Sequence, residues 1–272
     1  MRQRYATLAL AVILSLVAAA PGGSVVTSEV PLYKVLVGGR MIDGTGADPV
    51  EDAVLVIDNG RILAAGPRDT IEIPFRSEVV DISEMTVLPG FFNAHVHRGL
   101  STARLEAWAQ DGVTTVRDLG SNESTLAIFR SHFPPEPQRA RLVAAGPLIT
   151  VPGGYPIVPF GGSWNTVITS VNHARETGER LLDNGVDLLK LALETGTMFG
   201  QSIPVMTRGE ARMLVRVAHD RDTVVSAHIT STVDLDALLD VRLVIHEGTV
   251  IRNELQGRTP PPPRPGSGRA GG

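Results

Sequence analysis

Two kinds of hydrophobic pattern divide the chain. Residues 31–88 hold short extended runs, and Ala53–Ile57 and Arg61–Ala65 flank the tripeptide Asp58-Asn59-Gly60. Asn-Gly between apolar runs is the strongest short signal for a β-hairpin, because these two residues tolerate the positive φ angles of a tight turn. Another extended run follows at Val79–Val87. The pattern therefore predicts a small strand-rich domain over residues 31–88.

From His95 onward, strand-like and helix-like stretches alternate, which is typical of parallel βα units and predicts an α/β fold. Gly112 and the Pro134-Pro135 pair mark helix ends, and Thr207 with Glu210 has the spacing of a capping box. The predicted helices are Ser101–Asp111, Glu123–Phe133, Ser170–Asp183, Thr207–Asp220 and Leu235–Leu239. The predicted strands after the first are Val113–Val116, Leu142–Ala145, Val186–Leu191, Val224–His228 and Leu243–His246.

The two ends of the chain differ from this alternation. Met1–Ala20 has a basic start, an apolar run and a small-residue stretch, which indicates a signal peptide and a secreted or periplasmic protein. An uncleaved N-terminal anchor is the alternative; after cleavage no stable membrane anchor is expected. Residues 253–272 are predicted to be a disordered tail rich in Pro and Gly. This tail is either natural or the product of a shifted reading frame.

Composition narrows the class of protein. An apolar content of 43% and a charged content of 20% are those of an ordinary globular protein. The net charge of -4 gives no electrostatic basis for binding nucleic acid. The chain has no cysteine, which excludes disulfides, thiolate metal sites and cysteine nucleophiles. These observations leave open a small-molecule site that is built from residues other than cysteine.

Metal-competent side chains fall at or near the ends of successive predicted strands. His95 and His97 are two residues apart, so they project from the same face of a strand and can hold one cation. Lys190, His228 and His246 follow at the ends of three later strands. In parallel barrels the functional residues lie at the carboxyl ends of the strands. The sequence therefore predicts that these five residues share one rim.

Lys190 requires a separate explanation, because a protonated amine cannot bind a metal. It stands among leucines, so burial should lower its pKa and leave a neutral amine. Such an amine can react with carbon dioxide to give a carbamate, which is an anionic oxygen ligand. The alternative is a lysine whose stem packs below the rim while its ammonium reaches water.

The segment Val87–His97 (VLPGFFNAHVH) resembles the first barrel strand of the metal-dependent amidohydrolase superfamily, in its imidazolonepropionase-like and prolidase-like branch. Asn93 stands where that pattern usually has Asp. Other segments resemble the family in the same order, namely Gly39–Gly46, Asp58–Gly66, Gly112–Gly120, Gly146–Tyr155 and Gly185–Leu191. The resemblance implies a TIM-type (β/α)8 barrel, here incomplete with about six strands over residues 89–252, beside a partial N-terminal β-sandwich.

The resemblance also implies the ligand set. His95 and His97 would hold one metal, His228 and His246 a second, and carbamylated Lys190 would bridge them as the catalytic lysine. The implied cofactor is zinc or another divalent transition metal, as one or two ions. The implied reaction is hydrolysis of a C–N bond in a small amide or dipeptide. Tyr155 is expected either to contact substrate or to pack a lid.

The sequence departs from the family pattern near its end. The family's general base is an aspartate after strand eight, whereas the last aspartate here is Asp240. The expected outcome is a C-terminally truncated chain that binds metal but hydrolyses amides poorly, and a catalytically inactive metal- or ligand-binding remnant is the alternative. Arg117 and Asp118 are expected to form a structural ion pair, and the alternative is that they reach the rim after the second strand. A glycosidase is disfavoured because histidines rather than paired acids occupy the strand ends.

Overall fold

The computed structural model describes residues 32–162, 165–196, 199–229, 243–246 and 249–253. These residues form two compact units, one ending at Pro89 and one beginning at Gly90. The predicted signal peptide, the predicted helix Leu235–Leu239 and all of the predicted tail after Asn253 lie outside the described residues and stay predictions. Within the described part of the chain, no helix is long and apolar enough to cross a membrane.

The first unit is one sheet with the strand order β3-β2-β1-β4, and β5 pairs with β1. Its strands are β1 (Tyr33–Met41), β2 (Val50–Asp58), β3 (Arg61–Pro67), β4 (Ser77–Asp81) and β5 (Thr86–Val87). The predicted hairpin is confirmed: Asn59 and Gly60 join β2 to β3 with φ angles of 46° and 73°. Val35 and Val54 are fully buried in this unit. The described residues form a single sheet here, so a sandwich stays a prediction.

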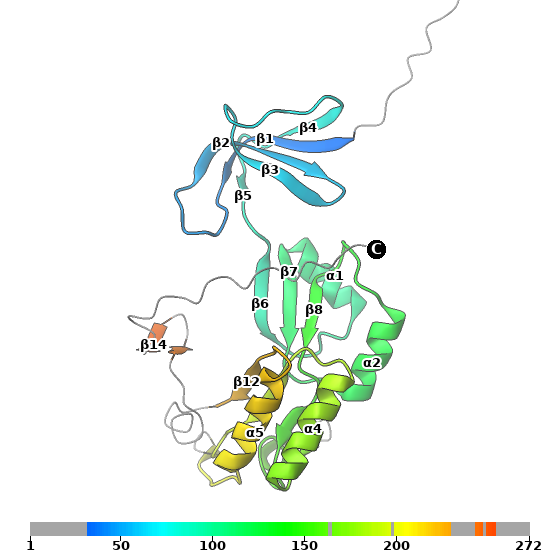
Figure 1. Ribbon diagram of the computed structural model, residues 1–272, viewed down its shortest axis with the longest axis vertical. Coiled ribbons are helices and arrows are strands. Elements are labelled where there is room, and N and C mark those ends of the chain that lie inside the picture. The colour runs from blue at the N-terminus through cyan, green and yellow to red at the C-terminus, as the bar shows by residue number, and fades with distance from the viewer. Residues whose placement is uncertain (1–31, 163–164, 197–198, 230–242, 247–248, 254–272) are drawn as a thin grey trace, which may run out of the picture. The chain divides into compact units, whose positions relative to one another are not determined.

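The second unit is built from parallel strands and helices, which confirms the predicted α/β class (Figure 1). Three strands form the order β6-β7-β8 and four form the order β10-β9-β11-β12. The strands are β6 (Phe91–Val96), β7 (Val113–Asp118), β8 (Arg141–Ala144), β9 (Leu148–Thr150), β10 (Asn165–Val167), β11 (Leu189–Ala192) and β12 (Val225–His228). The helices are α1 (Thr102–Gln110), α2 (Glu123–His132), α3 (Ile157–Phe160), α4 (Val171–Asp183) and α5 (Arg208–His219).

The third predicted strand is longer than its sequence pattern indicates, because it continues past a corner. Before the corner β8 pairs with β7, and after it β9 pairs with β11. Gly146 forms the corner at a φ of +67°, and a Cβ there would lie 2.7 Å from a methyl carbon of Val186. Glycine is therefore required both for the backbone angle and for the close approach. The predicted third strand therefore contributes to both sheets, through β8 before the corner and through β9 after it.

Helices α4 and α5 lie side by side and cover the second sheet (Figure 1). Gly178 of α4 allows the close approach, since a Cβ there would lie 3.1 Å from Val217 of α5. The fully buried core beneath them includes Ile149, Leu189 and Leu214. This packing fixes β11, the strand that carries Lys190.

One predicted strand pairs differently from the expectation. Residues Leu243–His246 do form a strand, β13, but it pairs antiparallel with β14 (Thr249–Asn253) and not in parallel beside β12. Only two residues separate His246 from its partner Thr249, and so short a connection permits only an antiparallel pair. Among the described residues, the expectation of a sixth parallel strand is therefore wrong, and the incomplete barrel stays a prediction. The side chain of His246 lies outside the described atoms.

The capping box at the start of α5 is confirmed and gives a test of this packing. The Thr207 hydroxyl accepts the Glu210 backbone N–H at 3.3 Å, and the Glu210 carboxylate accepts the Thr207 N–H at 2.7 Å. We expect Thr207→Ala to lower the free energy of unfolding by about 1 kcal/mol. Urea denaturation measures this loss. Thr207→Ser keeps the hydroxyl and serves as the control; equal losses in both variants would contradict the assignment.

Candidate metal centre

The two histidines after the Pro-Gly corner converge at the end of β6. Their Nε2 atoms lie 3.4 Å apart, and their ring centroids are 5.3 Å apart. Val96 between them is 7% exposed and belongs to the core, so the alternation of a strand turns both imidazoles to the opposite face. The pair therefore presents two nitrogen ligands to one point.

A cavity of about 480 Å³ adjoins this pair. It brings together four of the five predicted metal-site residues and the predicted substrate contact, Tyr155; His246 is the one whose side chain is not described. The lining residues are His95, His97, Arg98, Leu100, Leu119, Gly120, Ser121, Asn122, Thr125, Leu148, Tyr155, Pro156, Phe160, Lys190 and His228. Polar groups therefore meet a largely apolar wall, as in typical small-molecule sites.

Lys190 is 3% exposed, and its strand neighbours Leu189 and Leu191 are fully buried. Burial, assisted by the positive charge of Arg117, lowers the pKa of Lys190 to about 8. Its Nζ donates a hydrogen bond to the Ala227 carbonyl at 3.0 Å. The amine is thus held toward β12 and is much easier to deprotonate than an exposed lysine.

His228 ends β12, and its Nε2 atom is buried with no hydrogen-bond partner among the described residues. Burial lowers the pKa of this imidazole, Lys190 lowers it further, and Glu194 opposes the shift. Tyr155 lies flat against the ring, with centroids 3.9 Å apart and an interplanar angle of 10°. A neutral imidazole with an unpartnered nitrogen is what a metal ligand requires.

The donor set fits a divalent transition metal under one condition. Burial also lowers the pKa of His95, so neutral imidazoles are favoured at both strand ends. Among the described residues, however, no three His, Cys, Asp or Glu side chains form a group able to hold a metal ion. Within the described residues a further ligand would have to be another kind of group, and a carbamate on Lys190, whose side chain lines the cavity, would fit.

Two acidic residues near the centre have roles that the sequence did not predict: Glu194 was missed, and Asp118 was given another partner. Glu194 is 1% exposed, and its Oε1 accepts the Gly196 N–H at 2.6 Å. It stands four residues after Lys190, and this period-two spacing was the available signal. Asp118 is fully buried and accepts the backbone N–H groups of Gly99 and Gly120 at 2.6 and 3.0 Å.

The expected ion pair between Arg117 and Asp118 is wrong. Arg117 instead donates to the Ala94 carbonyl at 2.8 Å, while Asp118 binds the backbone of two loops. Neighbouring residues of a strand face opposite sides, which prevents the two side chains from meeting. Asp118 therefore ties together the turns after β6 and β7, from which the cavity wall is built.

The comparisons with known proteins agree with this architecture. A prolidase solved with N-methylphosphonate-L-proline superposes with a TM-score of 0.60 at 22% identity, covering 75% of this chain and 57% of that one. A Xaa-Pro dipeptidase with bound methionine superposes with a TM-score of 0.57 at 20% identity, covering 76% and 59%. Over about three quarters of this chain the fold resembles that of these two proteins. This confirms the resemblance that the motifs predict.

A sequence relative points the same way over a shorter stretch. The 5-methylthioadenosine/S-adenosylhomocysteine deaminase of Symbiobacterium thermophilum is 37% identical over 71 residues, which are 26% of this chain and 16% of the deaminase. No family model matches the sequence. The chain spans 57% and 59% of the two amidohydrolase-type structures.

The stack of Tyr155 on His228 gives a prediction for the site. Tyr155→Leu removes the flat ring that orients the imidazole, and we expect zinc affinity to fall about tenfold, as for other groups that orient metal ligands. Tyr155→Phe keeps the ring without its hydroxyl and should retain the affinity. Competition with a chromophoric chelator measures both. A loss in the Phe variant equal to that in the Leu variant would assign the effect to the hydroxyl instead.

Proposed function

We propose that this chain carries the metal centre of a hydrolase acting on C–N bonds of small amides or dipeptides. The observation that carries the proposal is the convergence of imidazole nitrogens on one cavity: the Nε2 atoms of His95 and His97, which face each other at 3.4 Å, and the buried Nε2 atom of His228, which has no partner among the described residues. The neighbouring folds include a prolidase and a dipeptidase, which supports the choice of bond.

In this proposal His95 and His97 would hold one metal, His228 and His246 would hold a second, and Lys190 would supply an anionic oxygen ligand as its carbamate. The neutral Lys190 amine attacks carbon dioxide, a nitrogen–carbon bond forms and one proton leaves the nitrogen, so that an anionic carbamate results. Bound zinc would polarise an amide carbonyl and lower the pKa of water. The apolar residues of the wall, such as Leu119 and Leu148, would lower the local dielectric and strengthen these electrostatic effects.

A second candidate is a protein that binds metal or ligand without turnover. The observation that favours it is the absence of any carboxylate among the described residues that line the cavity. C–N hydrolysis needs a group that takes a proton from water and returns it to the leaving nitrogen. Turnover of amides by the zinc-loaded polypeptide, set against its zinc content, separates the two candidates.

Elemental analysis tests the metal centre independently of activity. Protein refolded with zinc and bicarbonate is expected to retain about two zinc per chain after dialysis, as in two-metal hydrolases. Without carbon dioxide the value should fall, because Lys190 then contributes no oxygen ligand. A zinc content below 0.2 per chain in both preparations would refute the centre.

A further inference from the structure

Arg98, which directly follows the histidine pair, has an unusual backbone. Its φ is +63°, in the left-handed region that residues with a side chain adopt rarely. Such strain persists only where the surroundings enforce it, and it gathers at functional sites. The enforcing group is Asp118, whose buried carboxylate accepts the N–H of the next residue, Gly99, at 2.6 Å. The chain thus buries a carboxylate to hold this turn.

The Arg98 side chain lines the cavity and is exposed. Among the described residues it has no carboxylate partner, and no Asp or Glu of that part of the chain lines the cavity beside it. An arginine in a cavity without a counter-ion is suited to an anionic group of a ligand. Its planar fork binds a carboxylate with two parallel hydrogen bonds.

A second, independent observation comes from another residue that lines the same cavity. Ser121 is 7% exposed, its Oγ is buried without a partner among the described residues, and it stands just before α2. Asn122 caps the helix by accepting the Thr125 N–H at 3.2 Å. The Ser121 hydroxyl is therefore a spare donor beside the positive end of a helix dipole.

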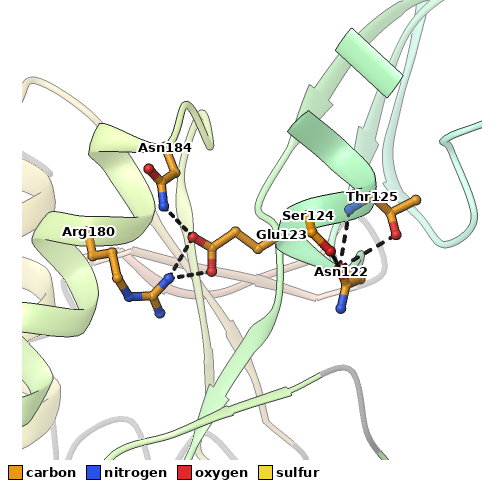
Figure 2. A network of polar contacts seen from close by, with 6 residues as sticks. All are labelled: Asn122, Glu123, Ser124, Thr125, Arg180 and Asn184. Atoms are coloured by element: carbon orange, nitrogen blue, oxygen red, sulfur yellow. Dashed lines mark hydrogen bonds and ion pairs between the residues drawn. The ribbon is translucent and has the colours of Figure 1, made fainter. Parts of the chain in front are cut away.

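The only acid in the first turn of α2, Glu123, does not line the cavity. Figure 2 shows the Glu123 carboxylate reaching Arg180 and Asn184 of the α4 region, while Asn122 stays on its own first turn. Burial opposes ionisation of Glu123, but the hydrogen bonds from Arg180 and Asn184 outweigh it and lower its pKa. Its negative charge is thus neutralised on the α4 side.

We propose that Arg98 and Ser121 form a subsite for a carboxylate of the substrate, so that the chain selects N-acyl amino acids and dipeptides over neutral amides. This inference rests on the proposed function for the identity of the cavity as a substrate site. Arg98 is a specificity-determining residue in it, and Asp118 is the positioning residue that fixes the turn.

Binding to chelator-treated, zinc-free protein tests the subsite, because no metal can then attract the carboxylate. The probes are N-acetyl-L-leucine and its methyl ester, measured by isothermal titration calorimetry. We expect the acid to bind about tenfold more tightly than the ester, since a hydrogen-bonded ion pair of this kind contributes more than 1.4 kcal/mol, or one factor of ten. Equal affinities would overturn the proposal.

The decisive variant is Arg98→Gly. Glycine adopts a φ of +63° without strain, so this variant should unfold at the same temperature as the parent or a higher one. It should nevertheless lose the preference for the acid, while Arg98→Lys keeps part of it. Arg104→Met, which removes an exposed arginine on α1 outside the cavity lining, is the matched control and should keep the full preference.

The outcome of this binding experiment can be distinguished from the outcome of the zinc analysis that tests the metal centre. A preference for the acid that depends on Arg98, in protein that never retains zinc, would leave the subsite standing and refute the proposed hydrolase. Normal zinc content with equal binding of acid and ester would do the reverse. An unchanged preference in Arg98→Gly would also overturn the subsite.

Discussion

Lys190→Ala is expected to lower the zinc content from about two ions per chain to one or fewer, because it removes the ligand shared by both ions in a two-metal centre. The described residues provide no replacement, since no three His, Cys, Asp or Glu side chains meet there. Elemental analysis of protein refolded with zinc and bicarbonate measures the loss. Hydrolysis of a dipeptide by the zinc-loaded protein should fall in parallel if the chain has turnover.

Two controls separate loss of the ligand from loss of the fold. Lys190→Met fills the same space without a nucleophile, so it should bind as little zinc as the alanine variant. It should also unfold at higher urea concentration than the parent without metal, because it removes a buried amine with a depressed pKa of about 8. Propionate, a small carboxylate, should restore zinc to Lys190→Ala and not to Lys190→Met. Full zinc content in Lys190→Met would refute the bridge.

Asp118→Ala is expected to lower the free energy of unfolding by about 3 kcal/mol, since hydrogen bonds to a charged group contribute about 1.5–3 kcal/mol each. The carboxylate is fully buried and satisfies the N–H groups of Gly99 and Gly120. Removing it leaves both donors without this partner and frees the strained turn at Arg98. Urea denaturation, followed by tryptophan fluorescence of Trp108, measures the change.

Asp118→Asn is the graded control for this position. It keeps the volume and one acceptor oxygen, so its loss of stability should be about half that of the alanine variant. The carboxylate preference of the cavity should weaken in both variants, because the turn that holds Arg98 loosens. A loss below 0.5 kcal/mol in Asp118→Ala would contradict its role, since such values are those of surface substitutions.

Much of both units could be predicted from the sequence because their signals are local. The Asn59-Gly60 hairpin, the serine and threonine caps and the alternation around Val96 each depend on a few adjacent residues. The placement of His95 and His97 on one face follows from the same alternation. The convergence of Lys190 and His228 on that pair also follows, once the strands are parallel and neighbouring.

Other features depend on tertiary contacts that no local pattern encodes. The third strand continues past Gly146 because Leu148–Thr150 finds a partner in β11, which lies about forty residues later. The burial of Asp118 and Glu194 follows from loops packing over them, and an acid in a sequence gives no sign of this. The antiparallel pairing of β13 with β14 was not predicted, because the two residues between these strands in the sequence are not the Asn-Gly pair that marks a hairpin.

The corner at Gly146 has a further consequence for how this protein can change. Because β8 is registered against β7 and β9 against β11, one inserted or deleted residue there would slide one half of the molecule's sheet past the other. The imidazoles at the end of β6 and the amine on β11 would then lie at different heights along the strands and would no longer face the same cavity. Length variation at this point is thus closed to evolution and to protein engineers alike, while the outer helices remain free to drift in sequence.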